Sequence, residues 1–343
     1  MRGQGSFDQQ RLIAALRPFD TGMGGMAGDW DAYREFYQLE WEIERVLERV
    51  PDRVLDRSRA REVLHSVGSL VVDEHRVVVQ QFAPTEPSGT AVVCHGYYDH
   101  VGLYGHLIGY LLSKGLVVIA FDQPGHGLSS GPRASIDDFG RYVRTLRAVL
   151  GAATSLPKPW HIVGQSMGAS VVLEYLATAE DSPFVEAVLF APLVRPALWS
   201  VNRWLYHAMR NVVTERPRRF TRNAENPEFL ELLRRDPLQA QALPVAWVTA
   251  MVEWMIRFEQ HGVLPINPKI IQGHADQTVG WRYNLKLIRE KCDPEVLEIP
   301  AARHHLVNES ADIRSEMWSW LDERCAWQAP DTKPVSRSDT DDE

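Results

Sequence analysis

The feature that most constrains the fold is a series of short apolar runs separated by helix-length segments. The runs are TAVVC (90–94), LVVIAF (116–121), WHIVG (160–164), AVLFA (187–191) and KIIQG (269–273). Strands that are apolar on both faces are typical of parallel sheets buried between two layers of helices. The chain therefore predicts an α/β fold with a mostly parallel central sheet flanked by helices.

Two segments ahead of these runs predict further elements. Residues 30–50 place aromatic and aliphatic side chains at three-and-four spacing, with charged residues between them. This pattern predicts an amphipathic helix whose apolar stripe packs on the body of the protein. Between Val63 and Phe82, two β-rich runs flank Asp73-Glu74-His75 and predict a hairpin.

The alternation of strand and helix breaks down between Arg195 and His261. This stretch is rich in Trp, Met, Arg and Pro and has no obvious core strand, so we expect a helical cap inserted between two strands. The last residues are polar and nearly devoid of apolar groups, which predicts a disordered tail. The expected division is an N-terminal helical extension (1–62), the first part of the α/β core (63–194), the cap (195–265), the second part of the core (266–327) and the tail (328–343).

Composition and charge exclude several classes of partner and scaffold. The 343 residues are 45% hydrophobic and 24% charged, which is enough to bury a full core. The net charge of −8 argues against a nucleic-acid partner, because a phosphate backbone requires a basic face. Cys94, Cys292 and Cys325 are odd in number and outside any CxxC spacing, so we expect neither a disulfide framework nor a zinc site.

The first residues lack the pattern of a secretion signal. Their apolar stretch covers only Leu12 to Leu16, and Arg17 follows at once. No stretch approaches the roughly 18 to 20 consecutive apolar residues of a membrane-spanning helix. Together with the cysteine usage, these features favour a cytoplasmic protein that is soluble or at most peripheral to a membrane.

The strongest local signal is the pentapeptide Gly164-Gln165-Ser166-Met167-Gly168. It follows the strand candidate WHIVG and precedes the helical run ASVVLEYLATA, so the serine lies on a strand-to-helix turn. A serine on such a turn projects its hydroxyl above the sheet, and the small glycines let the turn close. This position favours Ser166 as a catalytic nucleophile over a plain turn serine.

The base and the acid that a catalytic serine requires are found later in the chain. Asp276 follows the strand candidate KIIQG, where a loop at the carboxyl end of a strand would present it, although a turn-forming aspartate has the same pattern. His304 and His305 both follow the last strand candidate, EVLEIP. From chemistry alone, either histidine could be the base.

The negative oxygen of a tetrahedral intermediate requires backbone N–H donors. Met167 supplies one at the start of the helix after the nucleophile. Tyr97 supplies the second from the loop after TAVVC, where Gly96 permits close backbone approach, although a structural turn is the competing interpretation. Three histidines near this loop lack the carboxylate or cysteine pattern of a metal site: His95, His100 and His106.

With these residues the chain resembles the monoacylglycerol lipase and lysophospholipase branch of the α/β hydrolases, often labelled serine aminopeptidase-like. The resemblance covers about residues 65 to 325. Its motifs are an HG-x-x-[DE]-H-x-x-x-Y loop at 95–104, a D-x-x-GHG-x-SSG-x-R run at 122–133 and the GQSMG elbow at 164–168. It implies the α/β-hydrolase fold and a serine hydrolase that cleaves carboxylic esters through an acyl-enzyme, without metal or organic cofactor.

The same resemblance assigns roles residue by residue. The family's H-E-x-x-x-E segment begins at His304, which makes His304 the catalytic base and leaves His305 in place of a glutamate. Asp122 falls in a loop that the family uses as scaffold, so it stays outside the triad of Ser166, Asp276 and His304. The chain departs from the family's usual residues at Leu103 and Ala169, and these two departures bear on which substrate is bound.

The cap candidate carries a high density of large apolar side chains, which suits an acyl-chain pocket as well as helical core packing. We expect five of them to contact substrate: Trp199, Trp204, Trp247, Met251 and Trp254. Arginines in the same stretch could meet a phosphate headgroup or an anionic membrane surface, or form an ion-paired surface in water. These are Arg203, Arg210, Arg216, Arg218, Arg219 and Arg222.

The favoured function is hydrolysis of a lipid-like monoester, either a monoacylglycerol or a lysophospholipid. The same machinery serves a small soluble ester, a peptide amide or acyl transfer, although proline-releasing relatives carry tryptophan where this chain has Met167. A catalytically silent binding protein is the remaining alternative, and such proteins typically lose a triad member. The expected partner is a small-molecule ester or lipid, with peripheral membrane contact through the cap as an option; chain length, headgroup and oligomeric state stay open.

Overall fold

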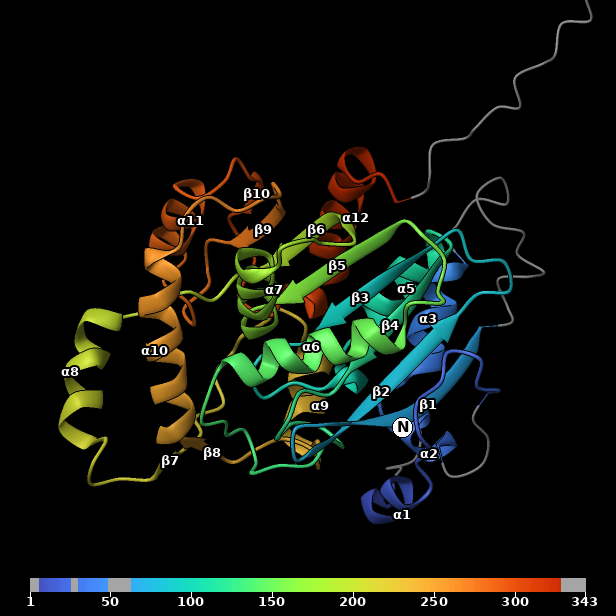
Figure 1. The fold of residues 1–343 in the computed structure, drawn as a ribbon, viewed down its shortest axis with the longest axis horizontal. Coiled ribbons are helices and arrows are strands. Elements are labelled where there is room, and N and C mark those ends of the chain that lie inside the picture. The colour runs from blue at the N-terminus through green and yellow to red at the C-terminus, as the bar shows by residue number, and fades with distance from the viewer. Residues whose placement is uncertain (1–5, 26–29, 49–62, 328–343) are drawn as a thin grey trace, which may run out of the picture.

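An eight-stranded sheet forms the centre of the protein in a computed structural model that describes residues 6–25, 30–48 and 63–327 (Figure 1). The strand order is β1-β2-β4-β3-β5-β6-β9-β10. β2 pairs antiparallel with β1 and β4, and the other pairs are parallel. The prediction of a mostly parallel sheet is therefore confirmed. The strands are β1 (Leu64–Val72), β2 (His75–Ala83), β3 (Gly89–Cys94), β4 (Leu116–Phe121), β5 (Trp160–Gln165), β6 (Phe184–Phe190), β9 (Lys269–Gly273) and β10 (Glu295–Ile299).

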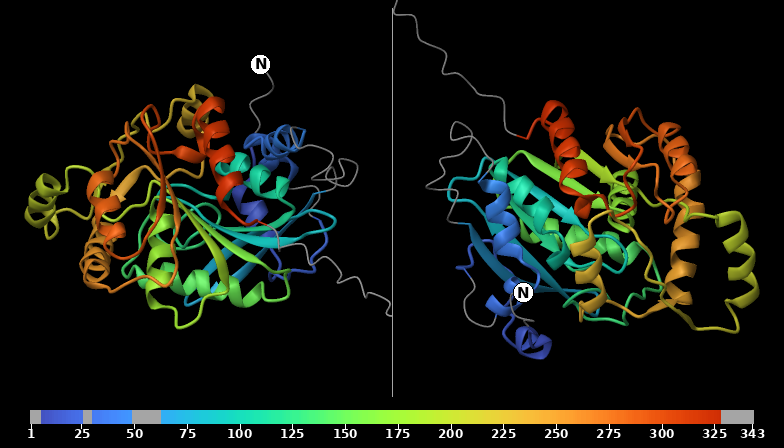
Figure 2. Two further views of the ribbon diagram at one scale, coloured as in Figure 1. Left: turned by 90° about the horizontal axis from the view of Figure 1, so that it is seen from above. Right: turned by 180° about the vertical axis from the view of Figure 1, so that it is seen from behind.

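Helices cover both faces of this sheet (Figure 2). One hydrophobic cluster joins the sheet to α6 (Gly140–Ala152), α7 (Met167–Thr178) and α11 (Trp281–Arg289). A second joins it to α5 (Gly105–Ser113) and α12 (Ala311–Arg324). Because side chains alternate along a strand, Val92 and Cys94 of β3 enter the first cluster while Ala91 and Val93 enter the second. The central strands β3, β4 and β5 are buried along their whole length, as their apolar sequences require.

The predicted hairpin is confirmed by β1 and β2. Val72 at the end of β1 pairs with His75 at the start of β2. Asp73 in the turn has a φ of 51°, a left-handed conformation that aspartate tolerates better than most residues. The hairpin adds two antiparallel strands to the edge of the parallel sheet.

The N-terminal segment forms two helices where the sequence pattern predicts one. After a first short helix, α1 (Gln9–Ala14), come α2 (Asp31–Phe36) and α3 (Leu39–Leu47), and Gln38 between them has a φ of 54°. The break follows from long-range packing of Tyr37, whose hydroxyl donates to Asp236 at 2.7 Å. Its ring also lies against Gly102, where a Cβ would come within 2.8 Å of it. The turn lets both helices bury apolar side chains while Tyr37 keeps these contacts.

The chain between β6 and β9 leaves the sheet and covers the carboxyl ends of its strands (Figure 1). β7 and β8 pair as a short antiparallel ribbon, which a search for apolar runs misses because both strands are exposed or half-buried. We propose that this segment is the cap expected at 195–265; the tail expected at 328–343 lies outside the described residues. Its elements are α8 (Trp199–Met209), β7 (Glu215–Pro217), α9 (Pro227–Arg235), β8 (Ala242–Pro244) and α10 (Val245–Gln260).

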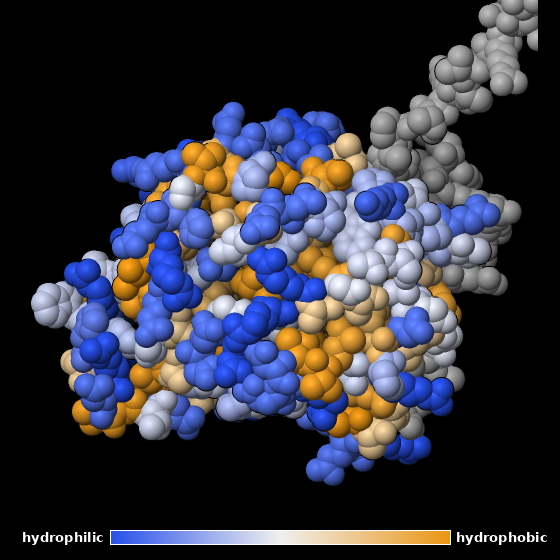
Figure 3. Space-filling view, in the orientation of Figure 1, coloured by the Kyte–Doolittle hydropathy of each residue, from blue (hydrophilic) through white to orange (hydrophobic). Residues whose placement is uncertain are grey.

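The surface is mixed in polarity. Polar and charged side chains cover most of the face in Figure 3, with apolar side chains between them. Exposed apolar side chains include Val201 and Trp204 of α8, a helix that stands out from the body in Figures 1 and 2. In the part of the chain that the structure describes, no helix is long and apolar enough to cross a membrane.

Candidate active site

Ser166 occupies a strained turn between β5 and α7. Its backbone has φ 54° and ψ −112°, which a side chain tolerates only when its surroundings hold it there. The neighbouring glycines make that possible. A Cβ on Gly164 would lie 2.7 Å from the backbone of Ala169, and a Cβ on Gly168 would lie 2.0 Å from the carbonyl oxygen of Cys94. The motif therefore holds the serine hydroxyl at the carboxyl end of the sheet for steric reasons.

The structure brings Ser166, His304 and Asp276 into one line of hydrogen bonds. The distance from His304 Nε2 to Ser166 Oγ is 2.9 Å, and the distance from His304 Nδ1 to Asp276 Oδ2 is 2.8 Å. Asp276 Oδ1 accepts the N–H groups of Thr278 at 2.7 Å and Val279 at 3.1 Å, which fixes the carboxylate. All three side chains belong to loops after β5, β9 and β10, so the parallel sheet brings them to one edge.

Electrostatics favour a charged Asp276 and a basic His304. Burial by itself would lower the pKa of His304, but the charge and hydrogen bond of Asp276 raise that pKa above its ordinary value. Burial likewise opposes ionisation of Asp276, yet His304 and two backbone N–H groups lower the pKa of this carboxyl. An ionised Asp276 holds the proton of His304 on Nδ1, which leaves Nε2 free to accept the proton of Ser166.

The two backbone donors expected to bind an oxyanion flank Ser166. Within the described residues, the N–H groups of Tyr97 and Met167 have no hydrogen-bond acceptor, so both are available to a ligand. Met167 is the first residue of α7, where the helix dipole adds to the positive potential. Tyr97 is held from two sides: its hydroxyl donates to the carbonyl of Ala134 at 2.7 Å, and its ring stacks on Trp247 at 3.7 Å.

A buried network that the sequence analysis did not foresee supports the same loop. The N–H of Gly96 donates to the hydroxyl of Tyr104 at 2.8 Å, and that hydroxyl donates to Asp99 at 2.9 Å. His305 Nε2 lies 3.1 Å from Asp99, whereas His304 contacts the serine. The geometry thus gives the two adjacent histidines different partners, and it places His305 against Asp99 of the loop that carries Tyr97.

Other residues singled out by motif have structural partners. Asp122 accepts the N–H groups of Val101 and Leu128 at 2.8 Å each, so it ties two loops together, away from the triad. His100 Nε2 lies 2.8 Å from Asp236 of the cap, a partner 136 residues away that no local pattern indicates. Among the described residues, no group of three His, Cys, Asp or Glu side chains is arranged to hold a metal ion.

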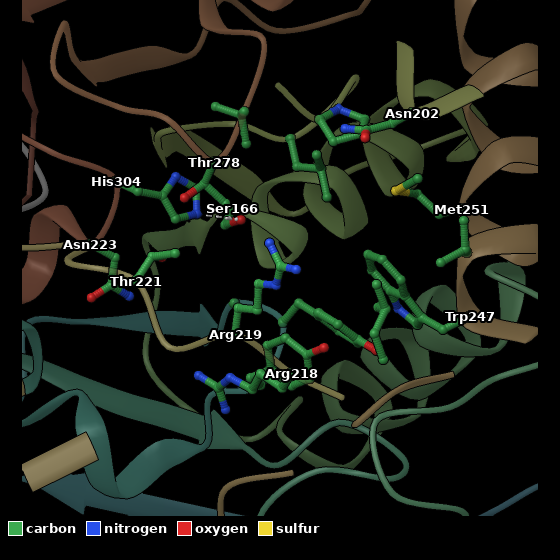
Figure 4. A pocket seen from close by; sticks show the side chains of 18 of the residues that line it. Ser166, Asn202, Arg218, Arg219, Thr221, Asn223, Trp247, Met251, Thr278 and His304 are labelled. Carbon is green, nitrogen blue, oxygen red and sulfur yellow. Dashed lines mark hydrogen bonds between the residues drawn. The ribbon is translucent and has the colours of Figure 1, made fainter. Parts of the chain in front are cut away.

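A cavity of about 410 Å³ opens over Ser166 and His304 (Figure 4). Its walls combine the nucleophile loop, the loop of Tyr97 and the inner sides of α8 and α10. The apolar part of the lining consists mainly of Leu193, Trp199, Leu205, Leu243, Val245, Trp247, Val248, Met251 and Val279.

Three of the five side chains expected to contact substrate line this cavity, namely Trp199, Trp247 and Met251. The other two lie elsewhere, and this corrects the expectation for them. Trp204 is 73% exposed on α8, on the outer side of the helix. Trp254 is fully buried, and its indole donates to Glu174 at 2.9 Å. Helix α10 runs from the cavity into the core. Only the first half of the helix therefore faces the cavity.

The arginines of the cap also divide into two groups. Arg203 and Arg222 do not line the cavity, and Arg222 pairs with Glu225 on the surface. Four arginines do line it: Arg210, Arg216, Arg218 and Arg219.

The fold and the site together define an α/β hydrolase with a serine, histidine and aspartate at the carboxyl edge of a parallel sheet. The family model described as serine aminopeptidase, S33, matches residues 85–311, and the chain belongs to this family. The expected resemblance and the expected α/β-hydrolase fold are both confirmed.

Known proteins similar to this chain include monoacylglycerol lipases. The monoacylglycerol lipase of Mycolicibacterium smegmatis is 27% identical over 263 residues, which cover 72% of this chain and 92% of that protein. The human monoglyceride lipase is 27% identical over 70% of this chain and 84% of its own length. The crystal structure of Paleococcus ferrophilus monoacylglycerol lipase superposes with a TM-score of 0.62 at 22% identity and covers 72% of this chain and 98% of its own. This structural likeness bears on the fold.

Proposed function

We propose that the protein hydrolyses carboxylic monoesters with a lipid-like acyl chain, using Ser166 as nucleophile, His304 as base and Asp276 as the acid that orients it. The observation that carries this proposal is that Ser166, His304 and Asp276 are joined by hydrogen bonds and that Ser166 and His304 line a largely apolar cavity. The named relatives support the same substrate class, since they are monoacylglycerol and monoglyceride lipases.

The reaction follows from the positions of these groups. His304 Nε2 takes the proton of Ser166 as Oγ attacks the ester carbonyl carbon, and the carbonyl oxygen becomes an oxyanion between the N–H groups of Tyr97 and Met167. His304 then gives the proton to the leaving alcohol, and an acyl-enzyme remains on Ser166. Water attacks that ester in the same way, which releases the carboxylic acid and restores the serine.

The apolar lining distinguishes a lipid-like monoester from a small soluble ester or a peptide amide. An acyl chain buried beside Trp199, Trp247 and Met251 gains up to about 0.8 kcal/mol for each CH₂ removed from water, which is about fourfold in binding. A small soluble ester would leave most of the cavity filled with water.

The test is a series of p-nitrophenyl esters from two to sixteen carbons, measured together with a monoacylglycerol and lysophosphatidylcholine. We expect kcat/KM to rise with chain length until the cavity is filled and then to level off. A maximum of kcat/KM at the acetate ester would contradict a lipid-like substrate but would still agree with ester hydrolysis. Labelling by a fluorophosphonate, which reacts with an activated serine, separates a silent binding protein from an enzyme.

The pH dependence of kcat/KM should report the titration of His304 in the free enzyme. Because His304 must be neutral to accept the proton and Asp276 raises its pKa, activity should fall as the pH is lowered through a value above the ordinary 6.5. Asp276→Asn removes the raising charge, so the acid limb should move to lower pH while kcat falls by about 10⁴. An acid limb at the same pH in both proteins would contradict the role of Asp276.

A further inference from the structure

The cavity over Ser166 is lined by several basic side chains, although the protein is acidic as a whole. The chain has a net charge of −8, yet four arginines line the cavity and Asp99 is the one carboxylate among its lining residues. Asp99 lies 3.1 Å from His305 Nε2 and accepts a hydrogen bond from the Tyr104 hydroxyl at 2.9 Å. We propose that Arg210, Arg216, Arg218 and Arg219 form a binding site for a phosphate group on the alcohol part of the ester. This proposal rests on the ester hydrolysis proposed above.

Arg218 is a half-buried cation that forms no direct ion pair with any described carboxylate. Asp99 and Asp236 act on its charge only from a distance, and each of them is hydrogen-bonded to other side chains. Its guanidinium lies 4.0 Å from the ring centre of Tyr98 and 4.4 Å from that of Phe220. It donates to the side chain of Gln239 and, at 3.3 Å, to the carbonyl of Ala240, which are neutral acceptors. Burial lowers the pKa of this guanidinium. A buried charge is costly unless it is paired at close range, so an anion in the cavity would supply the direct contact that these two carboxylates do not make.

Arg219 and Arg216 keep their guanidinium groups free for a ligand. Neither forms an ion pair or a side-chain hydrogen bond with any residue that the structure describes. In Figure 4 the side chain of Arg219 extends from the segment between β7 and α9 toward Ser166 and His304. An anionic group of a substrate bound at Ser166 would therefore lie within reach of this guanidinium.

Several other arginines around the cap, although not all of them, have carboxylate partners. Arg222 and Arg303 both pair with Glu225, and Arg195 pairs with Glu259 at 2.7 Å. An ordinary ion-paired surface therefore accounts for those side chains, whereas it does not account for the four arginines of the cavity.

The two sides of the cavity match the two ends of a phosphorylated ester. The apolar side is formed by α8 and α10, through Trp199 and Met251, and it suits the acyl chain. Most of the basic lining comes from residues 216–220, which run from β7 into the segment before α9, and the nucleophile lies in the same cavity. Guanidinium groups bind phosphate oxygens through paired N–H donors, which a neutral glycerol cannot exploit. Since Arg218 faces into the cavity, its position fits a bound molecule better than a flat bilayer surface.

The first test compares hexanoylglycerol with hexanoylglycerol 3-phosphate, two short esters kept below the concentration at which they form micelles. The quantity measured is the ratio of kcat/KM for the phosphorylated ester to kcat/KM for the neutral one. We expect the wild type to prefer the phosphorylated ester and Arg219→Gln to reduce the ratio about tenfold, with a larger loss in Arg216→Gln/Arg219→Gln. Arg203→Gln, on α8 outside the cavity, is the matched control and should keep the wild-type ratio.

The outcomes separate this proposal from the function on which it rests. Hydrolysis of both esters with the same ratio in the wild type and the variants would overturn the phosphate site and leave the esterase standing. Hydrolysis of neither ester would contradict the proposed function.

If neither ester is hydrolysed, a binding measurement tests the phosphate site independently of catalysis. Calorimetric titration of Ser166→Ala with glycerol 3-phosphate should give saturable binding that the additional Arg219→Gln substitution abolishes. Binding of inorganic phosphate without binding of glycerol 3-phosphate would overturn the proposal in favour of a free-anion site. If the Arg219→Gln substitution weakened binding to phosphatidylglycerol vesicles but left binding of glycerol 3-phosphate unchanged, the proposal would be overturned in favour of a membrane contact.

Discussion

Ser166→Ala is expected to reduce kcat for ester hydrolysis by about 10⁴ to 10⁶ while leaving the fold intact. The substitution removes the oxygen that lies 2.9 Å from His304 Nε2, so no acyl-enzyme can form. Alanine has the same Cβ as serine, and the strained backbone with φ 54° is therefore no more costly than in the wild type. The residual rate should come from substrate binding and the two oxyanion donors alone.

The measurement is turnover of a medium-chain p-nitrophenyl ester, together with fluorophosphonate labelling and thermal unfolding. Ser200→Ala, an exposed serine on α8, is the matched control and should keep both turnover and labelling. An alanine variant at 166 that is labelled and turns over like the wild type would show that the nucleophile is another residue.

His304→Ala should be nearly as damaging as loss of the serine, whereas His305→Ala should retain most activity. The difference follows from the partners of the two imidazoles. His304 Nε2 contacts Ser166 Oγ and its Nδ1 contacts Asp276, while His305 Nε2 lies 3.1 Å from Asp99 of the loop that carries Tyr97. Loss of His305 removes one support of that loop and leaves the proton acceptor in place.

A double variant gives this prediction a sharper test. Because residues of a triad act as a unit, Ser166→Ala/His304→Ala should be about as slow as either single variant. His305→Ala should keep the acid limb of the pH profile, since the group that titrates is still present. A ranking in which His305→Ala is the slower enzyme would show that the base is assigned one residue too early.

Local sequence patterns were enough to find the strands of the central sheet and to single out Ser166 and Asp276, and the family resemblance added His304. A parallel sheet brings the carboxyl ends of its strands to one edge, so residues that follow strands lie close together whatever their separation in the chain. Ser166 follows β5, and Asp276 and His304 follow β9 and β10. The choice between His304 and His305 was different, because neighbouring loop residues share a position in the chain but point in different directions.

The sequence by itself therefore determined the α/β class and the strands of the central sheet, since these depend on short-range periodicity and chain order, and together with the family resemblance it gave the candidate triad. Only the tertiary structure decided the break at Tyr37, the burial of Trp254 away from the cavity and the separation of paired from unpaired arginines. Tyr37 bonds to Asp236, 199 residues away, and a periodic stripe indicates which side of a helix is buried but not what covers it. The charge of the cavity likewise arises because four arginines but only one carboxylate, Asp99, are among its lining residues, although acidic residues outnumber basic ones 45 to 37 in the whole chain.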